Sequence, residues 1–429
     1  MPELVQFLQA STSPLQVDGV FDHWSELISS SAFVWIFLIG IVRFDVPAFF
    51  FWVARMTNPR AFGPPPVTNA HLPFVSVLIA GRNPGDNIRR TIRSVLDSSY
   101  PRLEVIYVDD ASTDDSVFHA RTFERTGRVR VFAVNQHNGK PANLNIAIAM
   151  ARGDLAFVLD ADAEVEFYTI ANLVAYFRDP AVGAVCADIR VRNARANLLT
   201  RLEEIEYALN GSIARAWRAA IGLLPILPGA ASMFRASALR ELGGYDNGLG
   251  DDTDMTVRLR KKRWRLRFAG DARIWTDQPE TPQALLRQRI RWTRNMMKVR
   301  FRKHLDLFIP RYGWANTVLF VDLALFRVVF PLVACGAVAW GLLTNFGERA
   351  VVFTSLYWVS VIFVACKALI ANDVAGTPPF VDLIFVPLYL PYRLLLRTVD
   401  AFTILREALR IRLYHPYVPK RVWLEIPHW

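Results

Sequence analysis

The stretches VIYVDD at Val105–Asp110 and LAFVLDAD at Leu155–Asp162 decide the fold of this chain. Each is a short apolar run, rich in β-branched or aromatic residues, that ends in carboxylates, so both are predicted to be buried parallel strands. Ligands of open α/β sheets bind beyond the carboxyl ends of the strands. The two acidic strand ends therefore predict a site for a group that prefers carboxylates, and a divalent metal carrying a diphosphate fits.

The flanking residues extend these strands into an α/β domain. Val75–Ala80 reads as the first strand, and a helix capped by Asp86 or Asn87 follows it. Strand, helix and strand at this spacing form a βαβ unit, which is right-handed by default. Further on, Ala142–Ala151 is predicted to be helical, and so is the long stretch Ile189–Ala220.

Composition and charge favour a membrane protein. Hydrophobic residues make up 52% of the 429 residues, which is high for a soluble enzyme, and the net charge is +11. A basic cytoplasmic face accounts for that charge, whereas no basic run interleaved with aromatic residues supports nucleic-acid binding. The three cysteines, Cys186, Cys335 and Cys366, lie far apart, which indicates neither a paired-cysteine metal site nor a disulfide framework.

The first predicted membrane span covers residues 32–54, and residues 1–31 before it contain no Lys or Arg. Arg43 and Asp45 interrupt the span, and the sequence leaves open whether they pair with each other or face protein. Basic residues follow the span directly. This asymmetry predicts that segment 1–31 lies outside the inner cell membrane and that the domain at 72–310 is cytoplasmic.

Residues 316–400 are predicted to form a second membrane region of two to three helices. Two spans, near Val318–Leu343 and Val351–Ile370, follow from their apolar length. A third candidate, Phe380–Leu396, contains two prolines and an arginine. Counting it as a span puts the basic tail 401–429 outside, against the positive-inside tendency, so the number of C-terminal spans stays open.

Four motifs occur in order along the domain: Asp109-Asp110, Asp160-Ala161-Asp162, Gly250-Asp251-Asp252 and Gln288-Arg289-Ile290-Arg291-Trp292. Together, on a βαβ pattern between membrane spans, they resemble the D, DxD, (E/D)D, QxxRW signature of the processive family 2 glycosyltransferases. That group includes cellulose, chitin, hyaluronan and poly-N-acetylglucosamine synthases. The resemblance implies a GT-A-type α/β catalytic domain, with a Rossmann-like mixed sheet, and flanking α-helical transmembrane segments.

The resemblance assigns the donor side of the site to five residues. Asp162 would bind Mg²⁺ or Mn²⁺, which clamps the two phosphates of a UDP-sugar, and Asp160 would hold the ribose or the sugar. Asp109 or Asp110 would accept a hydrogen bond from the uracil N–H, with turn chemistry after a strand as the alternative. Lys140 lies in a KPANLN stretch that looks like the KAGNLN stretch of cellulose synthases, and its ammonium suits phosphate.

Asp252 is the candidate general base. An inverting transfer needs one carboxylate to take the proton from the acceptor hydroxyl as that oxygen attacks the anomeric carbon. The usual Glu-Asp of the family is Asp251-Asp252 here, which shortens one side chain and leaves the role of Asp251 open. Both carboxylates can also cap the helix that they begin, and the two roles are compatible.

The acceptor side is assigned on the same resemblance. Trp292 would stack on the acceptor sugar, while Gln288 and Arg291 would bind the diphosphate of the nucleotide and polar groups of the acceptor. Gly229 and Ala230 belong to a small, turn-like segment that would let a sugar approach the backbone. The alternative for the helix that carries Trp292 is an interfacial helix with Trp and Arg anchors.

The resemblance, together with the predicted membrane spans, thus implies a membrane-embedded, processive, inverting glycosyltransferase. It would polymerise UDP-glucose or UDP-N-acetylglucosamine into a β-linked polysaccharide and translocate it. Its partners would be the UDP-sugar, the growing polysaccharide, the lipid bilayer and any accessory export subunits, but not nucleic acid. The alternatives are a non-processive glycosyltransferase that makes a lipid-linked sugar and, from another class, a membrane transporter or sensor with a degenerate nucleotide fold; product length and UDP release distinguish them.

Overall fold

The computed structural model describes residues 32–58, 63, 72–246, 248, 250–343, 346–375 and 383–409. The predicted N-terminal segment 1–31 and the tail beyond residue 409 lie outside the described residues. The strands are β1 Val75–Gly81, β2 Leu103–Asp109, β3 Val129–Ala133, β4 Leu155–Asp160, β5 Glu164–Val165, β6 Val182–Val191, β7 Ala231–Arg235 and β8 Arg265–Thr276.

Helices fall into two groups, those around the sheet and those toward the predicted spans. The first group is α5 Asn87–Leu96, α6 Ser116–Arg121, η3 Glu124–Thr126, α7 Lys140–Met150, α8 Thr169–Ala175, η4 Tyr176–Arg178, α9 Leu198–Glu206, η5 Tyr207–Ile213, α10 Ala214–Ala220, α11 Ala236–Leu242, α12 Asp251–Lys261, α13 Pro282–Lys298, η6 Val299–Lys303, η7 Leu305–Phe308 and η8 Pro310–Tyr312. The second group is α3 Ala32–Gly40, η1 Ile41–Asp45, α4 Val46–Thr57, α14 Trp314–Leu323, η9 Ala324–Val329, α15 Phe330–Leu343, α16 Phe346–Ala375, η10 Leu383–Phe385 and α17 Val386–Ala408.

The strands form one mixed sheet in the order β3-β2-β1-β4-β7-β6-β8-β5. The first four strands in this order are parallel, β7 runs antiparallel to both of its neighbours, and β6 and β8 are parallel to each other. The two strands predicted from their acidic ends, β2 and β4, lie on either side of β1. The predicted α/β mixed sheet is therefore confirmed.

Both faces of the central strands are buried, which explains why their sequences are continuous apolar runs. Leu78 of β1 belongs to a core shared with α7, α9 and the helices α4, α16 and α17 of the second group. Its neighbour Val77 belongs to a core shared with α5, α6 and α8. Because side chains alternate along a strand, one strand supplies both cores. Helices α4, α16 and α17 thus pack onto the same side of the domain as α7 and α9.

The predicted helix at Ile189–Ala220 is wrong over its first residues. β6 continues to Val191 and pairs in parallel with β8, where Ile189 lies opposite Ile274. Helix begins only at Leu198 of α9, capped by the Asn197 side chain. The long-range partner strand decides the structure of this segment, and a local pattern does not contain that information.

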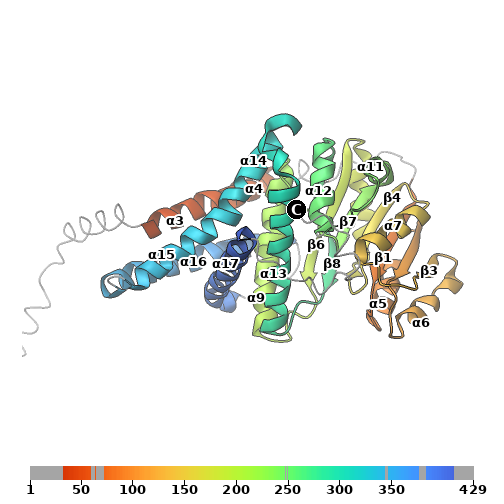
Figure 1. Ribbon diagram of the computed structural model, residues 1–429, viewed down its shortest axis with the longest axis horizontal. Helices are drawn as coiled ribbons and strands as arrows, with labels where there is room; N and C mark the ends of the chain where they lie inside the picture. The colour runs from red at the N-terminus through yellow and green to blue at the C-terminus, as the bar shows by residue number, and fades with distance from the viewer. Residues whose placement is uncertain are drawn as a thin grey trace, which may run out of the picture.

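Among the described residues, three helical stretches are long and apolar enough to cross a membrane: Phe37–Thr57, Trp314–Gly336 and Thr354–Asn372. They overlap the first predicted span and the first two C-terminal ones, and α17, which overlaps the third candidate, is not among them. Figure 1 shows these helices on one side of the molecule, with α9 and α13 between them and the sheet.

Charged residues join the three stretches to one another. Arg43 of η1 pairs with Asp322 of α14, and Asp45 pairs with Lys367 of α16 at 2.8 Å. Arg43 and Asp45 do not pair with each other, because residues two apart on a helix point in different directions. Each charge faces protein, the second of the two options that the sequence left open.

Candidate active site

The acidic strand ends lie side by side at one edge of the sheet. Gly81 at the end of β1 is opposite Asp109 of β2, and the preceding Ala80 is opposite Asp160 of β4. Since the strands are parallel, all three carboxyl ends point the same way. The first two predicted motifs therefore share one edge.

The first carboxylate pair organises its surroundings. Asp109 is buried and accepts hydrogen bonds from the Tyr107 hydroxyl and the Ser112 N–H, both at 2.8 Å. Asp110 accepts hydrogen bonds from the backbone N–H groups of Asn138 at 2.7 Å and Gly139 at 3.1 Å. Asp110 thereby fixes the loop that leads into α7. Asp110 also contacts Nδ1 of His137 at 2.7 Å, so it keeps less free hydrogen-bonding capacity than Asp109. A role of either carboxylate toward uracil stays a prediction.

Lys140, the first residue of α7, lies at the centre of the site. Its ammonium contacts the Asp160 carboxylate and lies 3.4 Å from the carbonyl oxygen of Gly229. Burial alone would lower the pKa of Lys140, but the carboxylates of Asp160, Asp251 and Asp252 raise it above its usual value. Residues from α7, β4, the segment before β7 and the start of α12 therefore converge on one cation.

Asp162 lies beside this group. Its side chain is exposed at the surface of the site, yet the surrounding protein and then the neighbouring Asp160 carboxylate raise its pKa to about 6. No cluster of three or more metal-ligating side chains occurs in the part of the chain that the structure describes. A hard divalent cation that takes one or two carboxylates and completes its shell with phosphate oxygens fits this donor set.

The start of α12 requires glycine and presents Asp252. Gly250 adopts a φ of 72°, and a Cβ there would lie 2.9 Å from Cγ2 of Val299. Asp252 accepts a hydrogen bond from the Thr253 N–H at 2.6 Å, and burial, followed by the charge of Asp251, raises its pKa to about 6. The N-cap of α12 is Gly250 and no side chain caps it, but the Asp252 carboxylate accepts from an N–H of the first helical turn and still has the raised pKa that a general base needs.

Gly229 leaves room between the proposed base and Lys140. A Cβ at this position would lie 3.4 Å from Nζ of Lys140 and 3.7 Å from Cβ of Asp252. Any larger side chain would project into this space. The adjacent Ala230 is half-buried against the core under the site.

Helix α13 packs against the start of α12, because a Cβ on Gly250 would lie 3.2 Å from Cβ of Asn295. Residues three and four apart share a helix face, so Arg291 and Gln288 lie on the same face as Asn295. The Oε1 atom of Gln288 is buried and accepts no hydrogen bond from the described residues. Gln288 thus offers one buried acceptor to a ligand or water.

Trp292 is 40% exposed and rests on Arg289, whose Cζ lies 4.8 Å from the centre of the indole ring. Arg289 is buried and pairs with Glu206 at 2.7 Å and Glu203 at 3.2 Å, both on α9. The Tyr392 hydroxyl of α17 also donates to Glu206, at 3.1 Å. This network was not predicted, since Arg289 occupies an unspecified position of the motif.

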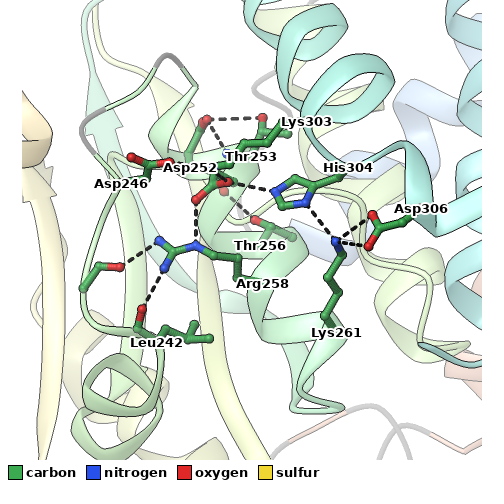
Figure 2. Close-up of polar contacts among 12 residues, drawn as sticks. Leu242, Asp246, Asp252, Thr253, Thr256, Arg258, Lys261, Lys303, His304 and Asp306 are labelled. Carbon is green, nitrogen blue, oxygen red and sulfur yellow. Dashed lines mark hydrogen bonds and ion pairs between the residues drawn. The ribbon is translucent and has the colours of Figure 1, made fainter. Parts of the chain in front are cut away.

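A second network holds the far side of α12 (Figure 2). Asp254 contacts Nε2 of His304 at 2.8 Å, Nζ of Lys303 at 2.6 Å and Nε of Arg258 at 2.7 Å. Burial alone would raise the pKa of Asp254, but the hydrogen bonds from His304 and Lys303 hold it well below its usual range. The network fixes α12 to the segment after α13. Only the Asp254–Arg258 spacing of four residues signals it in the sequence.

Comparison with known proteins agrees with this geometry. Residues 73–295 match the family described as "Glycosyltransferase like family 2". An N-acetylglucosaminyltransferase from Rhizobium meliloti (strain 1021) is 28% identical over 75% of this chain and 76% of its own length. The poly-beta-1,6-N-acetyl-D-glucosamine synthase of Staphylococcus aureus (strain MSSA476) is 27% identical over 65% of this chain and 70% of its own length.

A relative that aligns over a shorter stretch and a solved structure of similar fold complete the comparison. The probable glycosyltransferase YdaM of Bacillus subtilis (strain 168) is 35% identical, but the alignment covers 52% of this chain and 55% of that protein. The mannosyltransferase PcManGT from Pyrobaculum calidifontis, solved with GDP-Man and Mn²⁺, shares the fold with a TM-score of 0.56 at 21% identity, over 88% of this chain and 99% of that chain. With the matched region covering the whole sheet and all four motifs, the chain belongs to glycosyltransferase family 2 and is a glycosyltransferase.

Proposed function

We propose that the protein is a processive, inverting glycosyltransferase that extends a β-linked N-acetylglucosamine polymer from UDP-N-acetylglucosamine. The observation that carries this proposal is the convergence of Lys140, Asp160 and Asp252 at one edge of the sheet, with Asp162 beside them. The sugar is chosen over glucose because two of the relatives are described as N-acetylglucosamine enzymes.

On the donor side, the diphosphate would lie between Lys140 and Asp162. Lys140 would exchange part of its contact with Asp160 for phosphate oxygens, which releases that carboxylate toward the ribose or the sugar. A bound Mg²⁺ or Mn²⁺ on Asp162 would neutralise the charge of the leaving diphosphate; the mannosyltransferase of the same fold holds Mn²⁺. Asp109 or Asp110 would receive the uracil N–H at the neighbouring strand end.

In the chemical step, Asp252 takes the proton of the acceptor hydroxyl while that oxygen attacks the anomeric carbon. The bond between this carbon and the diphosphate oxygen breaks on the opposite face, so the configuration inverts. The pKa of Asp252, about 6, suits a base that must be ionised near neutral pH and still attract a proton. Gln288 and Arg291 would orient the leaving diphosphate and the acceptor.

Trp292 would hold the acceptor sugar on its exposed ring, and the bound end would be the end that grows. We further propose that the catalytic domain is cytoplasmic and that the polymer crosses the membrane through the chain's own spans. A reporter before Ala32 should then score as outside and one within residues 67–71 as cytoplasmic. The reverse pattern would refute the orientation and the use of a cytoplasmic nucleotide sugar.

The decisive experiment incubates the purified full chain with single UDP-sugars and Mg²⁺ or Mn²⁺, measures UDP release, and digests the product with linkage-specific hydrolases. A long hydrolase-sensitive polymer formed only from UDP-N-acetylglucosamine is the expected result. A product with one sugar on a lipid would refute processivity and support the lipid-linked alternative. Trp292→Ala should reduce polymer yield more than donor hydrolysis, because it removes a stacking surface.

A further inference from the structure

A cavity of about 340 Å³, with arginines in its lining, lies between the catalytic domain and the start of the second apolar stretch. Residues from the end of α10, the end of α12, the start of β8 and the start of α14 line it. None of the residues placed in the sugar-transfer site belongs to this lining. The residues that the following argument uses are Arg260, Arg263, Arg265, Arg267, Tyr312 and Asn316.

Arg260 is a buried cation without a counterion among the described residues. It is 8% exposed, and its guanidinium donates to Oδ1 of Asn316 at 2.7 Å and to the carbonyl oxygen of Gly222 at 3.0 Å. These acceptors are neutral, and burial lowers the pKa of Arg260 to about 10. A buried charge without an opposite charge is costly, so an anion in the cavity would stabilise this arginine.

Arg263 and Arg267 add further positive charge to the lining of the cavity. The side chains of Arg263 and Arg267 make no hydrogen bond or ion pair with described residues, whereas Arg265 pairs with Asp179 at 3.1 Å. Arg263 also has a φ of 62°, in the left-handed region that side chains rarely adopt. Arg267 also lowers the pKa of the Asp179 carboxylate through its charge, so Asp179 balances part of the positive charge of Arg265 and Arg267. Four guanidinium groups therefore line one cavity, and among the described residues Arg260 and Arg263 make no ion pair with a carboxylate.

The cavity lies where an apolar helix leaves the catalytic domain. Tyr312 and Asn316 flank Trp314, the first residue of the stretch Trp314–Gly336. The large apolar side chains next to it are exposed: Trp314 is 72% exposed, and Ile309 is 61% exposed. Trp and Tyr side chains such as Trp314 and Tyr312 are enriched at membrane–water interfaces. The cavity would then open at the depth of lipid head groups.

We propose that this arginine-lined cavity binds the phosphate head group of an anionic membrane lipid. The inference rests on the membrane placement proposed above, but not on sugar transfer. Guanidinium groups match phosphate oxygens in geometry and charge, and basic pockets beside membrane helices take anionic head groups. The bound phosphate would supply the counterion that Arg260 lacks and would tie the first turn of α14 to the end of α12.

The test measures lipid retention by native mass spectrometry after reconstitution in nanodiscs of phosphatidylglycerol and phosphatidylcholine. The wild-type chain should retain phosphatidylglycerol selectively. The double variant Arg263→Gln/Arg267→Gln should weaken that retention about 30-fold, since each basic group near an anionic surface contributes roughly a factor of five. Neither residue is buried or paired in the described chain, so this variant should fold. Equal retention by wild type and variant would overturn the proposal.

Control variants test whether the effect depends on the position of the charge, and a phosphate control tests whether the ligand is a lipid or free phosphate. The pair Arg121→Gln/Arg125→Gln removes the same charge from exposed positions far along the sheet and should leave retention unchanged. Arg263→Lys/Arg267→Lys keeps the charge and should retain most of the lipid. Inorganic phosphate added to the detergent-purified chain should not raise its melting temperature as phosphatidylglycerol does; equal stabilisation by free phosphate would overturn the lipid assignment. The lipid-retention assay contains no sugar donor, so its result does not depend on sugar transfer. A protein that retains the lipid but transfers no sugar would refute the proposed function and leave the lipid site standing.

Discussion

Replacing Arg289 by methionine should separate acceptor binding from donor chemistry, because this guanidinium supports the Trp292 ring. Its Cζ lies 4.8 Å from the ring centroid, and its nitrogen atoms lie 3.2 Å and 2.7 Å from carboxylate oxygens of Glu203 and Glu206. Methionine keeps much of the length and packing of the arginine stem but removes the charge and the planar fork. The ring then loses its support on one side.

The size of the effect follows from two contributions. Loss of the cation–π contact removes about 0.5–2 kcal/mol, which is about 2- to 30-fold in acceptor binding. Breaking a buried ion pair from one side costs about 3–5 kcal/mol of folding stability. Glu203 can offset part of that cost by taking up a proton, since burial, opposed by Arg289, already raises its pKa to about 7. We therefore expect a folded, less stable variant whose main functional loss is in elongation.

The assay compares UDP release with polymer yield at several oligosaccharide concentrations. Arg289→Met should lower elongation at low oligosaccharide by the factor above and recover it at saturation, while hydrolysis of the donor stays near the wild-type rate. The elongation rate of Arg289→Lys at low oligosaccharide should lie between the rates of wild type and Arg289→Met. Arg287→Met is the matched control, because Arg287 is exposed on the same helix. If folded Arg289→Met elongates normally, or loses hydrolysis and elongation equally, the supporting role of Arg289 is refuted.

Asp162→Asn should abolish transfer and weaken metal-dependent UDP binding; unchanged UDP and Mn²⁺ affinities in calorimetry would contradict its role as metal ligand. Asp252→Asn should keep UDP affinity while the chemical step slows about 10²–10⁴-fold. In the wild type, kcat/KM should fall as the pH drops below about 6, where Asp252 becomes protonated, and a flat profile there would exclude it as the base. In wild type, folded Glu203 holds a proton up to a pH of about 7, whereas the unfolded chain releases it near pH 4.5. Wild type should therefore lose melting temperature relative to Glu203→Gln as the pH rises from about 4.5 to about 7. If the melting temperatures of the two proteins change in parallel with pH, the raised pKa of Glu203 is contradicted.

The sheet and its acidic edge could be predicted because their signals are local. An apolar run that ends in Asp109 or Asp160 specifies both a strand and the end at which its carboxylate lies, and the βαβ connection then sets the direction. The register confirms the consequence, since both residues are opposite adjacent positions of β1. The helix start at Gly250–Asp252 could also be predicted, because a glycine followed by acidic residues is typical of the first turn of a helix.

The networks around the site could not be predicted, because their partners are distant in sequence. Arg289 and Glu206 are separated by 83 positions, and Asp254 and His304 by 50. From its local sequence an arginine on this helix is interpreted as a membrane anchor. Only the ion pairs between α13 and α9 show that Arg289 faces two glutamates instead. The same limit explains the error at Ile189, whose partner strand β8 lies far along the chain.

Charge balance at the site predicts that donor and metal bind as one unit. Lys140 contacts Asp160 and also faces Asp251 and Asp252, and Asp162 adds a further carboxylate beside Asp160. A diphosphate brings more negative charge than one ammonium can balance, so UDP alone should bind weakly. Conversely, the described residues contain no cluster of three metal-ligating side chains, so a divalent cation needs phosphate oxygens to complete its shell. In calorimetry, UDP with Mn²⁺ should therefore bind much more tightly than either component alone. Tight binding of Mn²⁺ without nucleotide, or of UDP in the presence of a chelator, would contradict this reasoning and with it the placement of the diphosphate between Lys140 and Asp162.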